Sequence, residues 1–239
     1  MISSSTGASK FPDNKGLIED VFHEIRSILS GILSSVELIE LYGSGQFNTE
    51  KSGEKINRQA GAIKSQVIEL EFLLQNVRII QHILNKSLSS KRAPAKIALL
   101  LKNVVEDDRY APLFASWVQY NVNSDREVAY VDEFLIRQLL LNLLFRMQRN
   151  SQPQERPTLT ITFEKDYFEL KGVYLANAND HSLSSSIKTF QHESLQAYLD
   201  QRICSLIAYV AELHDGRFEI SALPEGKIEM LVHIPYDVN

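Results

Sequence analysis

Two long runs of regularly spaced apolar residues constrain this chain more than any other feature of its sequence. Between Gly16 and Tyr42, apolar side chains recur at alternating steps of four and three residues, the spacing of a coiled-coil seam. A second run follows the turn-forming residues 43–45 and reaches Leu84. Together they predict a helical hairpin over residues 16–90, with a second helix of about 40 residues. The seams are Ile18, Phe22, Ile25, Leu29, Ile32, Val36 and Ile39, then Ile56, Ala60, Ile63, Val67, Leu70, Leu74 and Val77.

More apolar residues lie beside these seams, and an isolated hairpin would leave them in water. They are Val21, Ile28, Leu33, Ile68, Phe72, Leu73 and Ile80. Each Leu or Ile that a neighbour covers contributes about 1.5 to 3 kcal/mol of transfer free energy. A two-fold dimer forming a four-helix bundle would cover them, and packing against later helices of the same chain is the alternative. We expect the dimer, because no third long heptad run follows.

The sequence changes character after residue 90. The polar stretch 87–94 predicts a linker, and residues 95–239 mix helical and strand patterns. These patterns predict an α+β architecture, a sandwich with helices on one face of a mixed sheet. The Ser-rich residues 1–15 are expected to be disordered. Helices are expected at 96–107, 132–149 and 195–213, and strands at 117–122, 128–130, 159–163, 167–170, 217–222 and 228–234.

Composition and charge exclude several function classes. A formal net charge of −5 argues against a nucleic-acid partner, because affinity for nucleic acid rests on clustered Lys and Arg. The first ten residues lack an apolar signal stretch, and the most apolar later segment, 134–145, is interrupted by polar residues, so no membrane span is expected. The single cysteine, Cys204, lies in an apolar run and predicts a buried structural thiol in a reducing cytoplasm.

The first helix carries a histidine that is expected to face water. His23 follows the seam residue Phe22, so at about 100° per residue it lies on the flank of the helix. Small residues follow it at offsets of four, seven, eight and eleven, namely Ser27, Ser30, Gly31 and Ser34. This stripe would let a partner approach the backbone closely. For Ser30 and Gly31, tight packing of the second hairpin helix is an equally good explanation.

Residues 23–28, His-Glu-Ile-Arg-Ser-Ile, resemble the phosphoacceptor box of the histidine kinases. The resemblance implies that His23 carries a phosphoryl group, that Glu24 accepts a proton from the imidazole, and that Ser27 positions water for dephosphorylation of a partner. Arg26 joins Ser30, Gly31 and Ser34 as expected partner-docking residues. Ile28 occupies the place of the family's usual proline, so no kink is required there.

The later sequence resembles the ATP-binding (GHKL) domain of the same family, but it departs from the family's nucleotide motifs. Residues 132–144 match the helix that bears the first motif, yet Arg146 stands where a second, metal-binding asparagine is usual. Residues 172–180 lack the Asp-x-Gly-x-Gly spacing of the adenine site. Gln201 and Ile203 occupy the positions of phosphate-loop glycines. Arg146 and Arg149 are expected to solvate a helix, with the binding of a replacement ligand as the alternative. His214 is expected to be structural, a cationic side chain near the carbonyls of a helix end.

The resemblance therefore implies a histidine phosphotransferase that exchanges phosphoryl groups with receiver-domain aspartates. Such a protein would be a cytoplasmic homodimer that binds a response regulator, holds no cofactor or metal of its own, and relies on Mg²⁺ from the receiver. A non-catalytic pseudokinase scaffold that regulates a response regulator or kinase is the alternative from another class. An autokinase with a rebuilt ATP site is a third hypothesis, and it would require ATP-binding residues that the sequence does not reveal.

Overall fold

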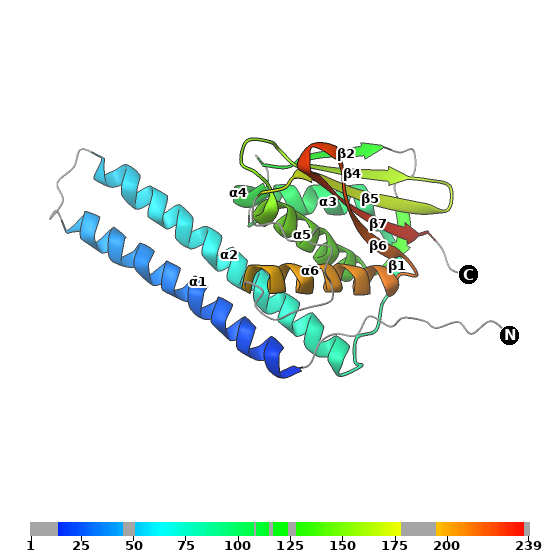
Figure 1. The fold of residues 1–239 in the computed structure, drawn as a ribbon, viewed down its shortest axis with the longest axis horizontal. Helices are drawn as coiled ribbons and strands as arrows, with labels where there is room; N and C mark the ends of the chain where they lie inside the picture. The colour runs from blue at the N-terminus through cyan, green and yellow to red at the C-terminus, as the bar shows by residue number, and fades with distance from the viewer. Residues whose placement is uncertain are drawn as a thin grey trace. The chain divides into compact units, whose positions relative to one another are not determined.

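The computed structural model describes residues 14–44, 51–107, 109–114, 117–123, 128–177 and 195–236. The chain divides into two compact units, a helical unit that ends at Leu88 and an α/β unit that begins at Ser89 (Figure 1). No helix among the described residues is long and apolar enough to cross a membrane.

The helical unit is a hairpin of α1 (Asn14–Gly43) and α2 (Ser52–Leu84), which pack side by side (Figure 1). The predicted hairpin is therefore confirmed. The residues expected to remain in water were partly wrong: Ile28, Ile68, Phe72 and Ile80 are buried, whereas the seam residues Phe22, Leu29, Val36, Val67 and Leu74 are exposed. α2 ends at Leu84, as the second run predicts, and Lys86 beyond it has a φ of 53°, but the helix begins at Ser52 and has 33 residues rather than about 40. Of the segment expected to be disordered, Asn14 and Lys15 belong to α1 instead. Residues 1–13 lie outside the described part of the chain.

The α/β unit contains a five-stranded mixed sheet in the order β2-β4-β5-β7-β6. β2 pairs with β4 in parallel, and the other neighbours are antiparallel. Every second residue of β5 and β7 is buried, because one face of the sheet packs against the helices (Figure 1). The strands are β2 (Gln119–Asn123), β4 (Thr158–Phe163), β5 (Tyr167–Leu175), β6 (Arg217–Ala222) and β7 (Lys227–Pro235).

Three longer helices, α3 (Ile97–Glu106), α5 (Glu133–Asn150) and α6 (Leu195–Glu212), cover that face of the sheet (Figure 1). α5 begins at an N-cap, where the Asp132 side chain accepts a hydrogen bond from the Leu135 N–H at 3.1 Å. Most of α5 is buried on all sides, which is typical of a helix at the centre of a core. The predicted α+β sandwich with a mixed sheet is confirmed. The short helix α4 (Ala111–Phe114) and a 3₁₀ turn (Pro224–Gly226) complete the unit.

A small second sheet changes the expected position of the linker. β1 (Ala93–Lys96) pairs antiparallel with β3 (Val128–Val131), and Pro94 lies opposite Tyr130. The expected linker over 87–94 therefore ends earlier, at Arg92. The sequence pattern missed β1 because a four-residue strand with a proline carries almost no strand signal, although proline is tolerated in edge strands.

We predict that Gly216→Ala destabilises the α/β unit. A methyl group at this position would overlap the backbone carbonyl of His233, and a rigid strand cannot move aside. The expected loss is about 1 to 3 kcal/mol of unfolding free energy, measured by urea denaturation. Gly61→Ala is the control, because no atom lies within 4 Å of the added carbon and helix propensity favours alanine. Equal midpoints for the two variants would contradict this packing.

Candidate functional site

The His23 imidazole lies on the surface of α1, as the sequence predicts. Ser27, one helical turn further along, is exposed on the same side of the helix, and Glu24 is half-buried beside them. Arg26 is also exposed. The imidazole and the Ser27 hydroxyl are thus both accessible to a partner that approaches this side of the hairpin.

The stripe of small residues below His23 has two different surroundings. Ser30 and Ser34 are exposed, so a partner can reach them. Gly31 instead faces α2, where a methyl group would overlap the side-chain amide of Gln66. The neighbour at Gly31 is the end of a flexible side chain, so both explanations that the sequence left open still apply to this residue.

In the α/β unit, a line of polar residues runs through the otherwise apolar helix α5. Gln138, Asn142, Arg146 and Asn150 follow each other at steps of four, and none is more than 6% exposed. The Asn142 amide donates to the Gln138 carbonyl oxygen at 2.7 Å, and the Asn150 amide donates to the Arg146 carbonyl oxygen at 3.0 Å. The sequence signal for this line was the four-residue spacing of polar side chains on a core helix.

Arg146 is buried, and the expectation that it solvates a helix surface is wrong. Its Nη1 donates to the Tyr174 hydroxyl at 2.6 Å, and its Nε donates to the Cys204 sulfur at 3.0 Å. The guanidinium therefore joins α5 to β5 and α6 through polar contacts inside the core. Arg149, by contrast, is half-buried at the end of α5.

The environment of Cys204 also differs from the expected one, because the same guanidinium lies beside it. The thiol is half-buried rather than fully buried, and it accepts a hydrogen bond from Arg146. The apolar run around Cys204 predicted a core position, but the neighbouring guanidinium makes this part of the core polar. Sequence spacing alone does not bring residue 146 next to residue 204.

The other expected departures from a nucleotide site lie partly outside the described residues. Asn177, at the end of the β5 segment, donates from its side-chain amide to the Arg149 carbonyl oxygen at 2.9 Å. Residues 178–180 and the side chain of Gln201 are not described. Ile203 is buried, so its side chain packs in the core of the unit.

His214 is structural, as expected, but it is not a cation at a helix end. It is 1% exposed, and its Nε2 accepts the backbone N–H of Asp132 at 3.0 Å. An acceptor nitrogen carries no proton, so the ring is neutral. Burial lowers the pKa of His214 below its ordinary value, against the opposing effect of its hydrogen bond to the Val210 carbonyl oxygen.

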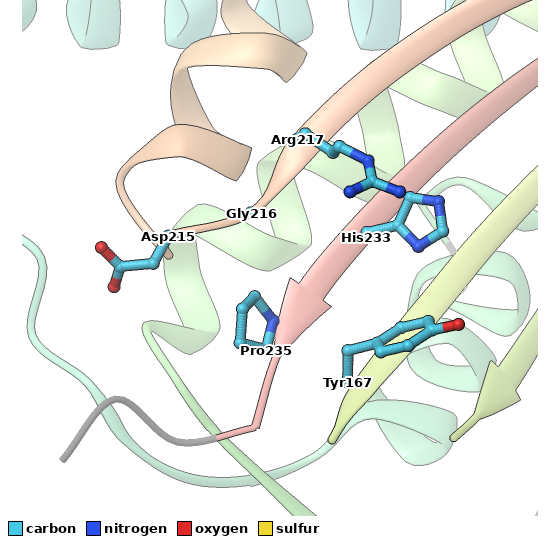
Figure 2. A pocket seen from close by; sticks show the side chains of 6 residues that line it. All are labelled: Tyr167, Asp215, Gly216, Arg217, His233 and Pro235. Carbon is cyan, nitrogen blue, oxygen red and sulfur yellow. The ribbon is translucent and has the colours of Figure 1, made fainter. Parts of the chain in front are cut away.

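A hollow of about 290 Å³ lies where α6, β5, β6 and β7 meet, lined by Tyr167, Asp215, Gly216, Arg217, His233 and Pro235 (Figure 2). Three of its polar side chains already have partners: Arg217 pairs with Glu219, His233 with Glu169, and Asp215 with Arg92. We assign it no role. Among the described residues, no three His, Cys, Asp or Glu side chains gather as a metal site would require.

No family model and no curated protein sequence matches this chain. Solved structures do. The histidine kinase AdeS of Acinetobacter baumannii aligns with a TM-score of 0.57 at 14% identity, over 90% of this chain and 98% of AdeS. Full-length ShkA in complex with AMPPNP aligns with a TM-score of 0.52 at 19% identity, over 91% of this chain and 45% of ShkA. The chain has the fold of the histidine kinases.

A third structure with the histidine-kinase fold was solved together with a partner. Histidine kinase ThkA, in complex with the response regulator protein TrrA, aligns with a TM-score of 0.51 at 16% identity, over 93% of this chain and 62% of that chain. The hairpin and the α/β unit thus occur here in the same order as in these kinases.

We predict that Arg146→Ala lowers the unfolding free energy by about 3 kcal/mol, because it removes a charged donor from Tyr174 and leaves a cavity. Urea unfolding followed by the fluorescence of Trp117, the single tryptophan, measures this loss. Arg149→Ala, at a half-buried position, is expected to cost less than about 1 kcal/mol. If both variants were equally stable, Arg146 would not be the core contact described here.

Proposed function

We propose that this chain is a histidine phosphotransferase of a phosphorelay, which exchanges a phosphoryl group between His23 and the aspartate of a receiver domain without binding ATP. The observation that carries the proposal is the exposed imidazole of His23, within a phosphoacceptor-like hexapeptide, on the hairpin of a histidine-kinase fold. The position of Arg146, where the family's second asparagine is expected, supports the proposal that the chain does not bind ATP.

The proposed transfer is a displacement at phosphorus. A neutral imidazole nitrogen attacks the aspartyl phosphate, a nitrogen–phosphorus bond forms, and the oxygen–phosphorus bond to the aspartate breaks. Glu24 takes the proton from the other ring nitrogen, which keeps the charge on the ring low. The Ser27 hydroxyl, exposed on the same side of α1, holds water for hydrolysis when the partner is dephosphorylated.

The residues at the expected metal position do not fit Mg²⁺. A magnesium ion requires oxygen ligands, and a guanidinium offers only donors and a positive charge. Arg146 donates to Tyr174 and Cys204 in the place where the family's second asparagine is expected. We therefore propose that the Mg²⁺ for the reaction comes from the receiver domain, and that the α/β unit serves to hold the receiver.

A response regulator is the partner that we propose. ThkA, which aligns with this chain over both units, was solved in complex with the response regulator protein TrrA. The exposed residues Arg26, Ser27, Ser30 and Ser34 are proposed to contact such a partner beside His23. The setting that we propose is the cytoplasm, as the single cysteine of the chain indicates.

The homodimer is also a proposal, and it is supported by the apolar surface of the single hairpin. Six large apolar side chains of α1 and α2 are between 37% and 62% exposed, namely Phe22, Leu29, Leu33, Val36, Val67 and Leu74. Four of these residues are on α1 and two on α2, so both helices contribute to the surface. A second hairpin would cover these residues in a four-helix bundle.

The phosphotransfer prediction is tested by incubating the chain with labelled phospho-receiver domains. The native chain is expected to acquire acid-labile label, because phosphohistidine hydrolyses in acid, whereas His23→Ala is expected to acquire none. His82→Ala changes another exposed histidine of the same hairpin and should behave as the native chain does. Binding without label would favour the pseudokinase scaffold, and label from ATP alone would favour an autokinase.

The dimer prediction is tested by light scattering after size-exclusion chromatography. The native chain is expected at about twice its mass of 27.2 kDa, and Leu29→Glu at the mass of one chain, because a carboxylate is costly to bury. Leu99→Glu is the control, since Leu99 on α3 is also 50% exposed but lies outside the hairpin. A native monomer, or a Leu29→Glu dimer, would contradict the interface.

A further inference from the structure

Hydrogen bonds hold the chain in place where it enters the α/β unit. The backbone N–H of Lys91 donates to Oδ2 of Asp132 at 2.7 Å. The Arg92 guanidinium donates to the Leu213 carbonyl oxygen and to Oδ2 of Asp215, both at 2.6 Å. The last residues before β1 are therefore bound to the start of α5 and to the end of α6.

His214 lies next to these bonds, and its own two hydrogen bonds require a neutral imidazole. Its Nε2 accepts the backbone N–H of Asp132 at 3.0 Å, and its Nδ1 lies 2.8 Å from the Val210 carbonyl oxygen, to which it donates. The same Asp132 thus donates its N–H to His214 and accepts the N–H of Lys91 with its carboxylate. A change at the imidazole acts directly on the residue that holds the chain.

The charged groups around His214 come from each element that meets there. Arg92, before β1, opposes protonation, while Asp132 at the start of α5 and Asp215 after α6 favour it. Burial is the largest effect, and the net result is a lowered pKa for His214. Both carboxylates are engaged, Asp132 with Lys91 and Asp215 with Arg92.

We propose that His214 is the proton-operated element of a latch that holds the linker, a latch made of Lys91, Arg92, Asp132, His214 and Asp215. A proton from water binds Nε2, which changes from an acceptor into a donor and can no longer accept the Asp132 N–H. The imidazolium then competes for the Asp132 carboxylate, and Lys91 is released.

Opening the latch lengthens the connection between the two units. On the hairpin side, the N–H of Leu88 donates to the His82 carbonyl oxygen at 3.2 Å, so the chain is held to α2 up to that residue. With the latch closed, residues 89–90 alone separate the two held ends. With the latch open, residue 91 joins them, while the Arg92 guanidinium stays bound to Leu213 and Asp215.

The direction of the pH effect follows from the lowered pKa. A group whose pKa is lower in the folded protein stabilises the fold most when it is neutral, above about pH 6.5 for a histidine. The latch is therefore closed at neutral pH, and its stability falls as the pH decreases from about 6.5 toward the lower pKa of the folded His214. Within that window, protection of the latch amides is expected to fall about tenfold per pH unit, and below the folded pKa it levels off.

The test is amide hydrogen exchange at Lys91 and Asp132, corrected for the intrinsic exchange rate, from about pH 7.5 to about pH 5. The native chain is expected to lose protection at both amides as the pH falls. His214→Gln is expected to show no such slope, because glutamine does not titrate and its side-chain oxygen can accept the Asp132 N–H. His233→Gln is the control for a general histidine effect, and it should keep the native slope.

Two results would overturn the latch. One is constant protection at Lys91 and Asp132 in the native chain across the titration of His214, followed through its ring nitrogens by NMR. The other is a native slope that persists in His214→Gln. If that variant does not fold, the native chain still decides, because the loss of protection must level off at the pH where the His214 ring is half protonated. The latch does not involve His23, so either proposal can fail without the other.

Discussion

The buried guanidinium of Arg146 is the interaction on which the α/β unit and its proposed function both depend. An arginine brought into a protein core must keep its donors satisfied, because an unpaired donor there costs free energy. Here the donors reach Tyr174 on β5 and Cys204 on α6, so the side chain crosslinks α5 to both neighbours. The same positive charge makes the position unsuitable for a metal ion. A single residue thus stabilises the core and supports the proposal that the chain transfers phosphoryl groups without ATP.

The two units have different surfaces, and different roles are proposed for them on that basis. The hairpin presents His23 and Ser27 to water, and it leaves large apolar side chains such as Leu29 and Leu33 exposed. One kind of surface suits a transient polar partner, and the other suits a permanent apolar one. The α/β unit buries a line of polar residues on α5, and three polar side chains that line its hollow are paired. We therefore propose that the chemistry takes place on the hairpin and that both units bind the partner.

Several elements show where sequence patterns succeed and where they fail. The seams of α1 and α2 repeat over many turns, so a few mismatches do not obscure them. β6 was predicted with its observed bounds, because its apolar and polar residues alternate between two turns. β1 was missed, since four residues with a proline become a strand only by pairing with β3. Cys204 was placed too deep, because its apolar neighbours along the chain do not reveal the arginine beside it in space.

The sequence by itself determined the hairpin, the order of the longer helices and of the described strands other than β1, and the exposure of His23, because each depends on spacing within one segment. Only the tertiary structure showed what surrounds Arg146, Gly31 and His214. Each of these residues depends on atoms that are distant along the chain, at Cys204, Gln66 and Asp132 respectively. From the sequence alone, a charged side chain is expected to face water, even where it binds a buried hydroxyl in the folded chain. Packing between elements fixes that environment, and it exists only in the folded chain.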